Sequence, residues 1–99
     1  MLDPSLIQIN VGGVSSLREI IGRDRIVVLK SGSTIGDLLS KLEEQFGSAY
    51  RELVGESLDY SLRRRFNMLY NGRVISLCEN LDMVLSDGDV VLFFQLAGA

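Results

Sequence analysis

The chain has 99 residues, of which 46% are hydrophobic and 23% are charged, and it carries a formal net charge of −3. This size and composition predict one folded domain over residues 1–99 and exclude disorder as the default state. A single cysteine excludes an internal disulfide framework, and the absence of histidine excludes histidine-based acid–base, triad or zinc chemistry. The acidic balance argues against nucleic acid as the main partner.

The first residues, Met1 to Ser5, lack the basic region and the long apolar region of a signal peptide. No apolar run approaches the roughly 20 residues that are needed to cross a bilayer. We therefore expect a cytoplasmic protein without membrane association, in which Cys78 is a reduced thiol.

The N-terminal third predicts a strand, a short helix and a second strand. Apolar and polar residues alternate over Leu6–Val11, which indicates a half-buried strand, and we expect Gly12-Gly13 to end it in a turn. Ser15–Gly22 is typical of a short helix that opens with a serine cap and closes with glycine. Arg25–Lys30 encloses a β-branched run of strand length.

The next element is predicted to be the main helix of the chain. Thr34 is the expected N-cap, and Asp37 lies three residues later, where an acid suits the helix dipole. We expect Gly47 to end this helix, and Ala49–Val54 to add a short helical turn. The prediction rests on an apolar stripe at helical spacing, which comprises Ile35, Leu38, Leu39, Leu42 and Phe46.

The second half predicts a hairpin and a final strand. Asn71-Gly72 lies between the apolar runs Phe66–Tyr70 and Arg73–Ser76, and this dipeptide is the strongest short-range signal for a two-residue hairpin turn. Ser86–Asp89 is predicted to be a turn that precedes the last strand, Val90–Leu96.

These elements, in this order, predict an α+β fold in which a mixed sheet packs on one main helix. Alternation along the last strand turns one set of residues toward the helix, and we assign to it Val90, Leu92, Phe94 and Leu96. Val91 and Phe93 then face outward and are predicted to form a docking patch for a partner. The alternative is a partly covered sheet face that has no partner.

Three further signals have ordinary structural interpretations. Cys78 has no histidine or second cysteine to activate it, so a small, partly buried hydrophobe is favoured over a nucleophile. Arg63–Arg65 ends the polar segment Gly55–Arg65, which we interpret as an inserted, solvated loop rather than a phosphate-binding or acid-binding patch. Asp87 and Asp89 flank a glycine and are favoured as turn residues over metal ligands. No metal site is predicted.

Several motifs occur in the order that is found in a known family. They follow the first strand, begin the main helix, form the hairpin and enter the last strand, and they comprise Leu17–Gly22, Thr34–Leu39, Tyr70–Ile75 and Leu85–Phe94. These motifs resemble those of the MoaD/ThiS-like sulfur carriers, and the Leu-Arg-Glu helix and Phe93-Phe94 lean toward MoaD. The resemblance covers nearly the whole chain except Gly55–Arg65. It implies the ubiquitin-like β-grasp fold, with a flexible tail over about residues 96–99.

The resemblance also implies chemistry at the C-terminal carboxylate. In this family an E1-like adenylyltransferase of the MoeB or ThiF type uses ATP to adenylate the terminal carboxylate, and sulfur then displaces AMP to give a thiocarboxylate. The acceptor is a molybdopterin-synthase large subunit or an analogous protein, in the synthesis of molybdopterin or tungstopterin. The chain is then a carrier rather than an enzyme and binds no cofactor itself. Its sulfur-carrying end is Gly98-Ala99, on a tail that comprises Gln95, Leu96 and Ala97.

The end of the sequence departs from the family, whose tail ends in Gly-Gly, because this chain ends in Gly98-Ala99. Three interpretations follow: the partner accepts alanine, the chain is an altered or unprocessed form of a Gly-Gly protein, or the domain has lost carriage and only binds partners. A ubiquitin-like modifier that is joined to lysines through the same activated terminus is a further alternative.

Overall fold

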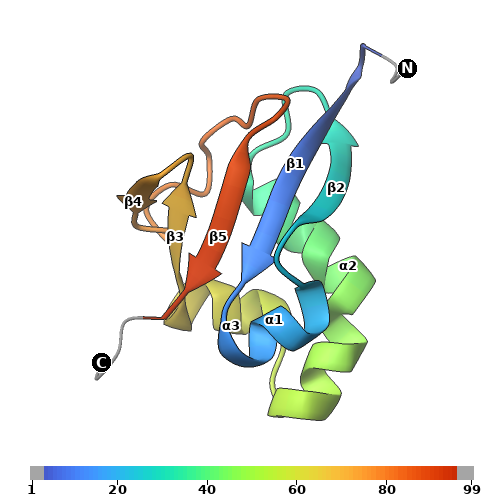
Figure 1. Ribbon diagram of the computed structural model, residues 1–99, viewed down its shortest axis with the longest axis vertical. Helices are drawn as coiled ribbons and strands as arrows, with labels where there is room; N and C mark the ends of the chain where they lie inside the picture. Colours follow the sequence, from blue (N-terminus) through green and yellow to red (C-terminus); the bar gives the residue numbers. More distant parts are fainter. Residues whose placement is uncertain (1–3, 96–99) are drawn as a thin grey trace.

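The computed structural model describes residues 4–95. Its centre is a five-stranded sheet in the order β2-β1-β5-β3-β4, in which β1 and β5 are parallel and the other neighbours are antiparallel. The long helix α2 lies behind the sheet (Figure 1), so the predicted mixed sheet on one main helix is confirmed. The elements are β1 (Leu6–Gly13), α1 (Ser15–Ile21), β2 (Arg25–Lys30), α2 (Ile35–Val54), α3 (Leu58–Arg65), β3 (Asn67–Tyr70), β4 (Arg73–Ile75) and β5 (Val90–Phe94).

One face of the sheet and the apolar side of α2 form the core. Leu38, Leu39 and Leu42 are fully buried, as the predicted apolar stripe requires. They pack in one cluster with alternate residues of the central strands, among them Ile9 of β1 and Met68 of β3. Burial of a side chain of this size stabilises the fold by about 1.5–3 kcal/mol, so this face holds the domain together.

The glycine pair Gly12 and Gly13 continues β1 instead of ending it, contrary to the predicted turn. Both residues pair with β5, opposite Leu92 and Phe93. A side chain on Gly12 would collide with the backbone oxygen of Arg23, and a Cβ on Gly13 would lie 2.7 Å from the Leu17 side chain. The glycines therefore permit close packing under a continuing strand, rather than a change of direction.

Helix α2 begins as predicted and extends further than predicted. The Thr34 hydroxyl accepts a hydrogen bond from the Asp37 N–H, and the Asp37 carboxylate accepts one from the Thr34 N–H, which is a complete capping box. Gly47 does not end the helix, which continues to Val54. The end is at Gly55, whose φ of 90° is the left-handed conformation that closes helices.

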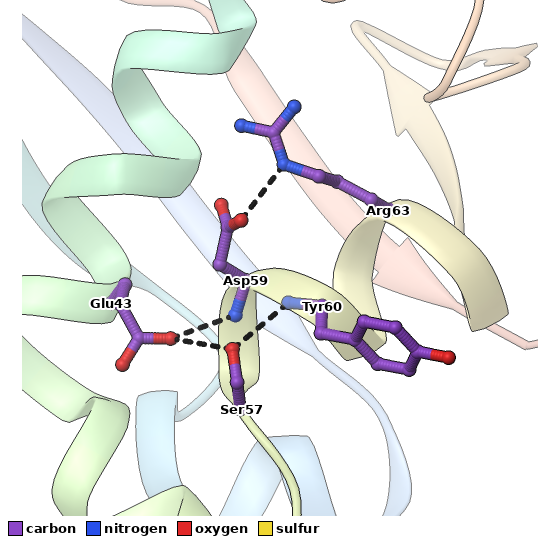
Figure 2. Close-up of polar contacts among 5 residues, drawn as sticks. All are labelled: Glu43, Ser57, Asp59, Tyr60 and Arg63. Carbon is purple, nitrogen blue, oxygen red and sulfur yellow. Dashed lines mark hydrogen bonds and ion pairs between the residues drawn. The ribbon is translucent and has the colours of Figure 1, made fainter.

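The buried Gly47 makes room for the side chain of Glu43, because a Cβ at Gly47 would overlap the Glu43 carboxylate. That carboxylate turns toward the start of α3, as Figure 2 shows. Its Oε1 accepts hydrogen bonds from the Ser57 hydroxyl at 3.1 Å and from the Asp59 N–H at 2.9 Å. A glycine that suggests a helix end in the sequence thus serves a contact between two helices.

The segment Gly55–Arg65 is not a loop, contrary to the prediction, because most of it forms α3. Leu58 and Leu62 are one helical turn apart and both are fully buried. The Ser57 hydroxyl caps the helix by accepting a hydrogen bond from the Tyr60 N–H at 3.1 Å. The two buried leucines and the cap explain why this mostly polar segment forms a helix.

Helix α1 lacks the predicted serine cap. Val14 occupies the N-cap position without a side-chain hydrogen bond. The predicted closing glycine is confirmed, since Gly22 has a φ of 93° and its N–H donates to the Arg18 oxygen at 2.9 Å. Over residues 4–95, no helix combines the length and the apolar character that crossing a membrane requires.

Candidate functional site

Strand β5 occupies the middle of the sheet, where it pairs with β1 on one side and with β3 on the other. It ends at Phe94, and Gln95 is the last residue that the structure describes. The remaining predicted tail and the sulfur-carrying end lie outside the described residues, and they comprise Leu96, Ala97, Gly98 and Ala99. The described part of the site is therefore strand β5, which hydrogen bonds to β1 and β3 fix up to the start of the predicted tail.

The predicted facing of β5 is wrong. Val91 is 1% exposed and Phe93 is 0% exposed, whereas Val90 is 50% exposed. The reason is the register, which places Val91 opposite the buried Val11 and Phe93 opposite the buried Met68. Since opposite residues in a sheet share a face, Val91 and Phe93 belong to the core and cannot dock a partner in the folded chain.

The open face of the sheet instead carries a different set of apolar side chains. Leu69 is opposite Leu92 on one side and opposite Val74 on the other, so these residues form one row across β5, β3 and β4. Val74 is 65% exposed. We define the open-face patch as this row and its neighbours along β5, which are Leu69, Val74, Val90, Leu92 and Phe94.

The open-face patch borders the predicted hairpin, which the structure confirms. Asn71 and Gly72 have φ values of 48° and 84°, as a two-residue turn of this kind needs. The Asn71 amide oxygen accepts a hydrogen bond from the Val90 N–H at 2.7 Å, and the Asn71 N–H donates to the Val90 oxygen at 2.8 Å. The turn residue therefore fixes β5 at its start, beside the exposed Val90.

Asp89 is buried beneath this turn and joins it to the turn that precedes β5. Its carboxylate accepts hydrogen bonds from the Tyr70 hydroxyl at 2.5 Å, the Asn71 amide at 3.0 Å and the Ser86 N–H at 2.8 Å. Burial by itself raises the pKa of Asp89, but these hydrogen bonds outweigh it and hold that pKa below its usual value. The same contact raises the pKa of Tyr70 to about 12.

The acidic pair in this turn has a structural role. Asp87 accepts a hydrogen bond from the Gln8 N–H at 2.7 Å, and Asp89 is saturated by its own donors. The interpretation of Asp87 and Asp89 as turn residues is confirmed. In the part of the chain that the structure describes, no cluster of acidic or cysteine side chains has the grouping that a metal ion needs.

The three arginines at the end of α3 have separate partners rather than one shared site. Arg63 pairs with Asp59 at 2.9 Å, and Arg65 pairs with Glu56 at 2.7 Å. The Arg64 guanidinium lies 5.1 Å from the centre of the Tyr60 ring. All three arginines lie on a helix and not on the predicted loop.

Cys78 is exposed, so the predicted partial burial of this side chain is wrong. Its Sγ lies 3.6 Å from the Ser76 hydroxyl. A serine hydroxyl does not activate a thiol in the way that histidine does. The structure adds nothing that favours a nucleophile at this position.

The sequence analysis placed no member of the open-face patch on this face, because it turned Val90, Leu92 and Phe94 toward the helix and did not consider Leu69 and Val74. A signal for Leu69 and Val74 exists, because a two-residue turn at Asn71-Gly72 fixes Tyr70 opposite Arg73 and hence Leu69 opposite Val74. The facing of β5 had no such signal, since five apolar residues in succession have no polar alternation to orient them.

The ThiS family model matches residues 14–98 of the chain. The solved HVO 2177 protein of Haloferax volcanii is 25% identical, with a TM-score of 0.71 over 100% of this chain and 92% of that chain. Small archaeal modifier protein 1 of Methanosarcina acetivorans is 22% identical, with a TM-score of 0.64 over 95% of this chain and 97% of that chain.

A candidate molybdopterin converting factor, subunit 1, of Pyrococcus furiosus is also similar. It is 22% identical, with a TM-score of 0.64 over 90% of this chain and 97% of that chain. No curated protein matches the chain significantly. The likeness to these small proteins confirms the predicted ubiquitin-like β-grasp fold.

Proposed function

The chain belongs to the ThiS family of small ubiquitin-like carriers and modifiers, and from this premise we propose that it is a sulfur carrier. In this proposal an E1-like adenylyltransferase of the MoeB or ThiF type adenylates the carboxylate of Ala99. Sulfur then displaces AMP and leaves a thiocarboxylate. The observation that carries the proposal is the family match, which runs through the predicted tail to residue 98.

The chemistry explains why a carrier needs an activating partner. A C-terminal carboxyl has a pKa of about 3.5, so it is ionised at neutral pH and is a poor electrophile. Its oxygen attacks the α-phosphorus of ATP, and pyrophosphate leaves. The resulting mixed anhydride has a good leaving group, and a sulfur nucleophile replaces AMP at the carbonyl carbon. The ATP is bound by the partner, and because that partner uses ATP we place the carrier in the cytoplasm.

The position of β5 supports a delivery role. The strand has neighbours on both sides, and its first residue is fixed by Asn71. The tail therefore begins at a defined point, beside the open-face patch. A partner that binds this patch would have the start of the tail in a known place, so that only a few small residues need to enter its active site.

The open-face patch is the docking surface in this proposal, in place of Val91 and Phe93. Its side chains are apolar and partly or largely exposed, and β5 contributes Val90, Leu92 and Phe94 directly before the tail. Contiguous exposed apolar surface on a small soluble domain is typical of a binding site. The activating enzyme and the acceptor would use it in turn, because each must reach the same terminus.

For the acceptor, we propose a molybdopterin-synthase large subunit or an analogous protein of molybdopterin or tungstopterin synthesis. Support comes from the MoaD-like motifs Leu17–Gly22 and Leu85–Phe94, and from the likeness to the Pyrococcus furiosus protein. The likeness to a small archaeal modifier protein favours a second candidate, which is a modifier joined to lysines through the same terminus. Conjugates of higher mass that persist in reducing, denaturing gels would identify this second function.

Reconstitution with the cognate activating enzyme, ATP and a sulfur donor tests the proposal. Intact-mass measurement is expected to show the gain for one oxygen replaced by one sulfur. Deletion of Gly98-Ala99 is expected to abolish the gain. The matched variant Ala99→Gly is expected to react at least as fast, because it removes a methyl group beside the reacting carbon.

The outcomes separate the interpretations of the Gly-Ala terminus. A sulfur gain by the unaltered chain means that the partner accepts alanine. A gain by Ala99→Gly alone means that this chain is an altered or unprocessed carrier. If neither form gains sulfur with an enzyme that is active on another carrier, the sulfur-carrier proposal is wrong and a binding module replaces it.

A further inference from the structure

The two edge strands of the sheet differ in what they offer to another chain. The strand order places β2 at one edge and β4 at the other. β4 has 3 residues, whereas β2 has 6 residues and runs alongside α2 (Figure 1). A long edge strand presents a row of unpaired backbone groups to which an extended peptide can add.

The register identifies which backbone groups of β2 are free. The Ser31 N–H donates to the Ser5 oxygen at 2.7 Å, next to the ladder in which Leu29 is opposite Ile7. Because hydrogen-bonded pairs alternate along antiparallel strands, Val27 and Leu29 bond to β1, while Ile26 and Val28 direct their N–H and C=O groups away from it. Within residues 4–95, no strand pairs with this outer side of β2.

The side chains at this edge are apolar and exposed. Ile26 is 51% exposed and Val28 is 38% exposed. Both line a groove of about 700 Å³ between β2 and α2, to which α2 contributes Lys41 and Gln45. The Ile26 and Val28 side chains stand on the face of the sheet that points away from α2, because they alternate with the buried Val27 and Leu29. The edge thus combines free backbone groups with exposed apolar residues and an adjoining groove, and these are the requirements for binding an extended segment.

The groove is also the place where the lysines of the chain gather. The sequence contains two lysines, Lys30 and Lys41, and both line this groove. The acid beside them, Asp37, is occupied by the capping box of α2. Asp37 keeps its own charge, so the lining of the groove carries two cations and one anion, which is a net positive charge in a chain whose formal net charge is −3.

We propose that the β2 edge binds an extended apolar segment of another protein, flanked by carboxylates, as an added strand. We define this surface as the edge groove. Backbone hydrogen bonds to Ile26 and Val28 would supply the pairing, and the carboxylates would lie near Lys30 and Lys41. The occupant is a partner and not a second copy, because a second β2 would bring Arg25 and Lys30 again and no carboxylate between them.

The edge groove is distinct from the open-face patch. β2 is separated from β5 by β1, and the open-face patch lies on β5, β3 and β4. A segment bound at β2 therefore leaves the root of the tail accessible. The inference goes beyond the proposed function, because binding at the edge groove does not require the terminus to be activated.

The test follows the backbone amide signals of the full-length, isotope-labelled chain in the presence of a synthetic peptide. The peptide has an apolar centre of valine and isoleucine and glutamates at both ends. Saturable shifts are expected over β2 and the side of α2 that carries Lys41. A peptide with lysines in place of the glutamates is expected to bind about fivefold more weakly or worse, since two exposed ion pairs are lost.

A variant and a modified peptide test the backbone pairing itself. Val28→Pro removes an outward N–H while leaving the bonds to β1 in place, and it is expected to abolish saturable binding. Where this variant does not give a folded amide spectrum, N-methylation of the peptide at successive residues is the alternative. Binding is expected to be lost only when the methylated residue is one of the alternate residues whose N–H faces β2.

Charge reversal provides the matched control. The double variant Lys30→Glu, Lys41→Glu is expected to lose binding, and Arg73→Glu on the opposite edge is expected to retain it. Three results would overturn the proposal: no saturable shift, shifts that lie on the open-face patch, or self-association of the free chain that Val28→Pro removes. The last of these would make a second copy the occupant.

Discussion

The two faces of β5 carry the same kinds of side chain and have opposite roles. Val91 and Phe93 are buried against the helices, while Val90, Leu92 and Phe94 belong to the open-face patch. Composition does not distinguish the two faces, because every residue of the strand is valine, leucine or phenylalanine. The residues opposite them in β1 and β3 determine which face is buried. Substitutions on the buried face should therefore change stability, and substitutions on the open face should change partner binding.

The largest effect is expected on the buried face. Phe93→Ala removes a side chain that is 0% exposed, and it should reduce the free energy of unfolding by about 3–5 kcal/mol through lost burial and a cavity. Denaturant unfolding measures the change. A loss below about 1 kcal/mol would mean that this face of β5 does not form the core.

The hydrogen bond between Tyr70 and Asp89 should give the next largest effect. Tyr70→Phe removes a donor from a buried carboxylate, at a cost of about 1.5–3 kcal/mol near neutral pH. Because the folded pKa of Asp89 is lowered, its contribution is present above its unfolded pKa of about 4 and is lost as the pH falls.

At high pH the stability that Tyr70 contributes changes with pH in the opposite direction to that of Asp89. The pKa of Tyr70 is raised to about 12, so the stability that it contributes is present below its unfolded pKa of about 10. That stability is lost as the pH rises from about 10 toward the folded pKa of about 12. The difference in unfolding free energy between wild type and Tyr70→Phe should therefore shrink at both extremes. A difference that does not change with pH would contradict the assigned contact.

The hairpin that fixes the start of β5 should be less sensitive. Gly72 has a φ of 84°, which a β-branched residue adopts poorly. Gly72→Val should therefore destabilise the chain by about 1–2 kcal/mol. The denaturation midpoint measures this, with Arg73→Val as a control at a neighbouring exposed position. Equal midpoints for the two variants would exclude the two-residue turn.

The smallest effect on stability is expected on the open face. Val74 is 65% exposed, so Val74→Asp should change the unfolding free energy by less than about 0.5 kcal/mol. The same variant should weaken binding of the activating enzyme, since it puts a charge at the β4 end of the row that forms the open-face patch. Binding measured by calorimetry that equals the wild-type value would remove Val74 from the interface.

The sequence predicted features that depend on local chemistry. Thr34 and Asp37 form their capping box, Asn71-Gly72 forms the hairpin, and β2 has the predicted bounds. Each signal lies within a few residues of its effect, so no knowledge of distant parts of the chain is needed.

The features that the sequence did not predict depend on contacts between distant segments. In the sequence Gly47 resembles a helix end, but in the structure the Glu43 carboxylate fills the space beside it. Gly12 resembles a turn residue, but in the structure the backbone oxygen of Arg23 lies against it. The facing of β5 depends on its register with β1, which lies about 80 residues earlier in a chain of 99. Long-range pairing of this kind is not visible in local periodicity.

In the proposed function, the open-face patch presents the tail of a sulfur carrier to its activating enzyme. Intact-mass measurement of sulfur uptake at limiting enzyme, compared between the wild-type chain and Val74→Asp, tests it most directly. We expect the wild type to gain one sulfur in place of oxygen, and Val74→Asp to gain it more slowly but to recover when enzyme is in excess. Equal rates at limiting enzyme, or no gain by wild type with an active enzyme, would contradict the claim.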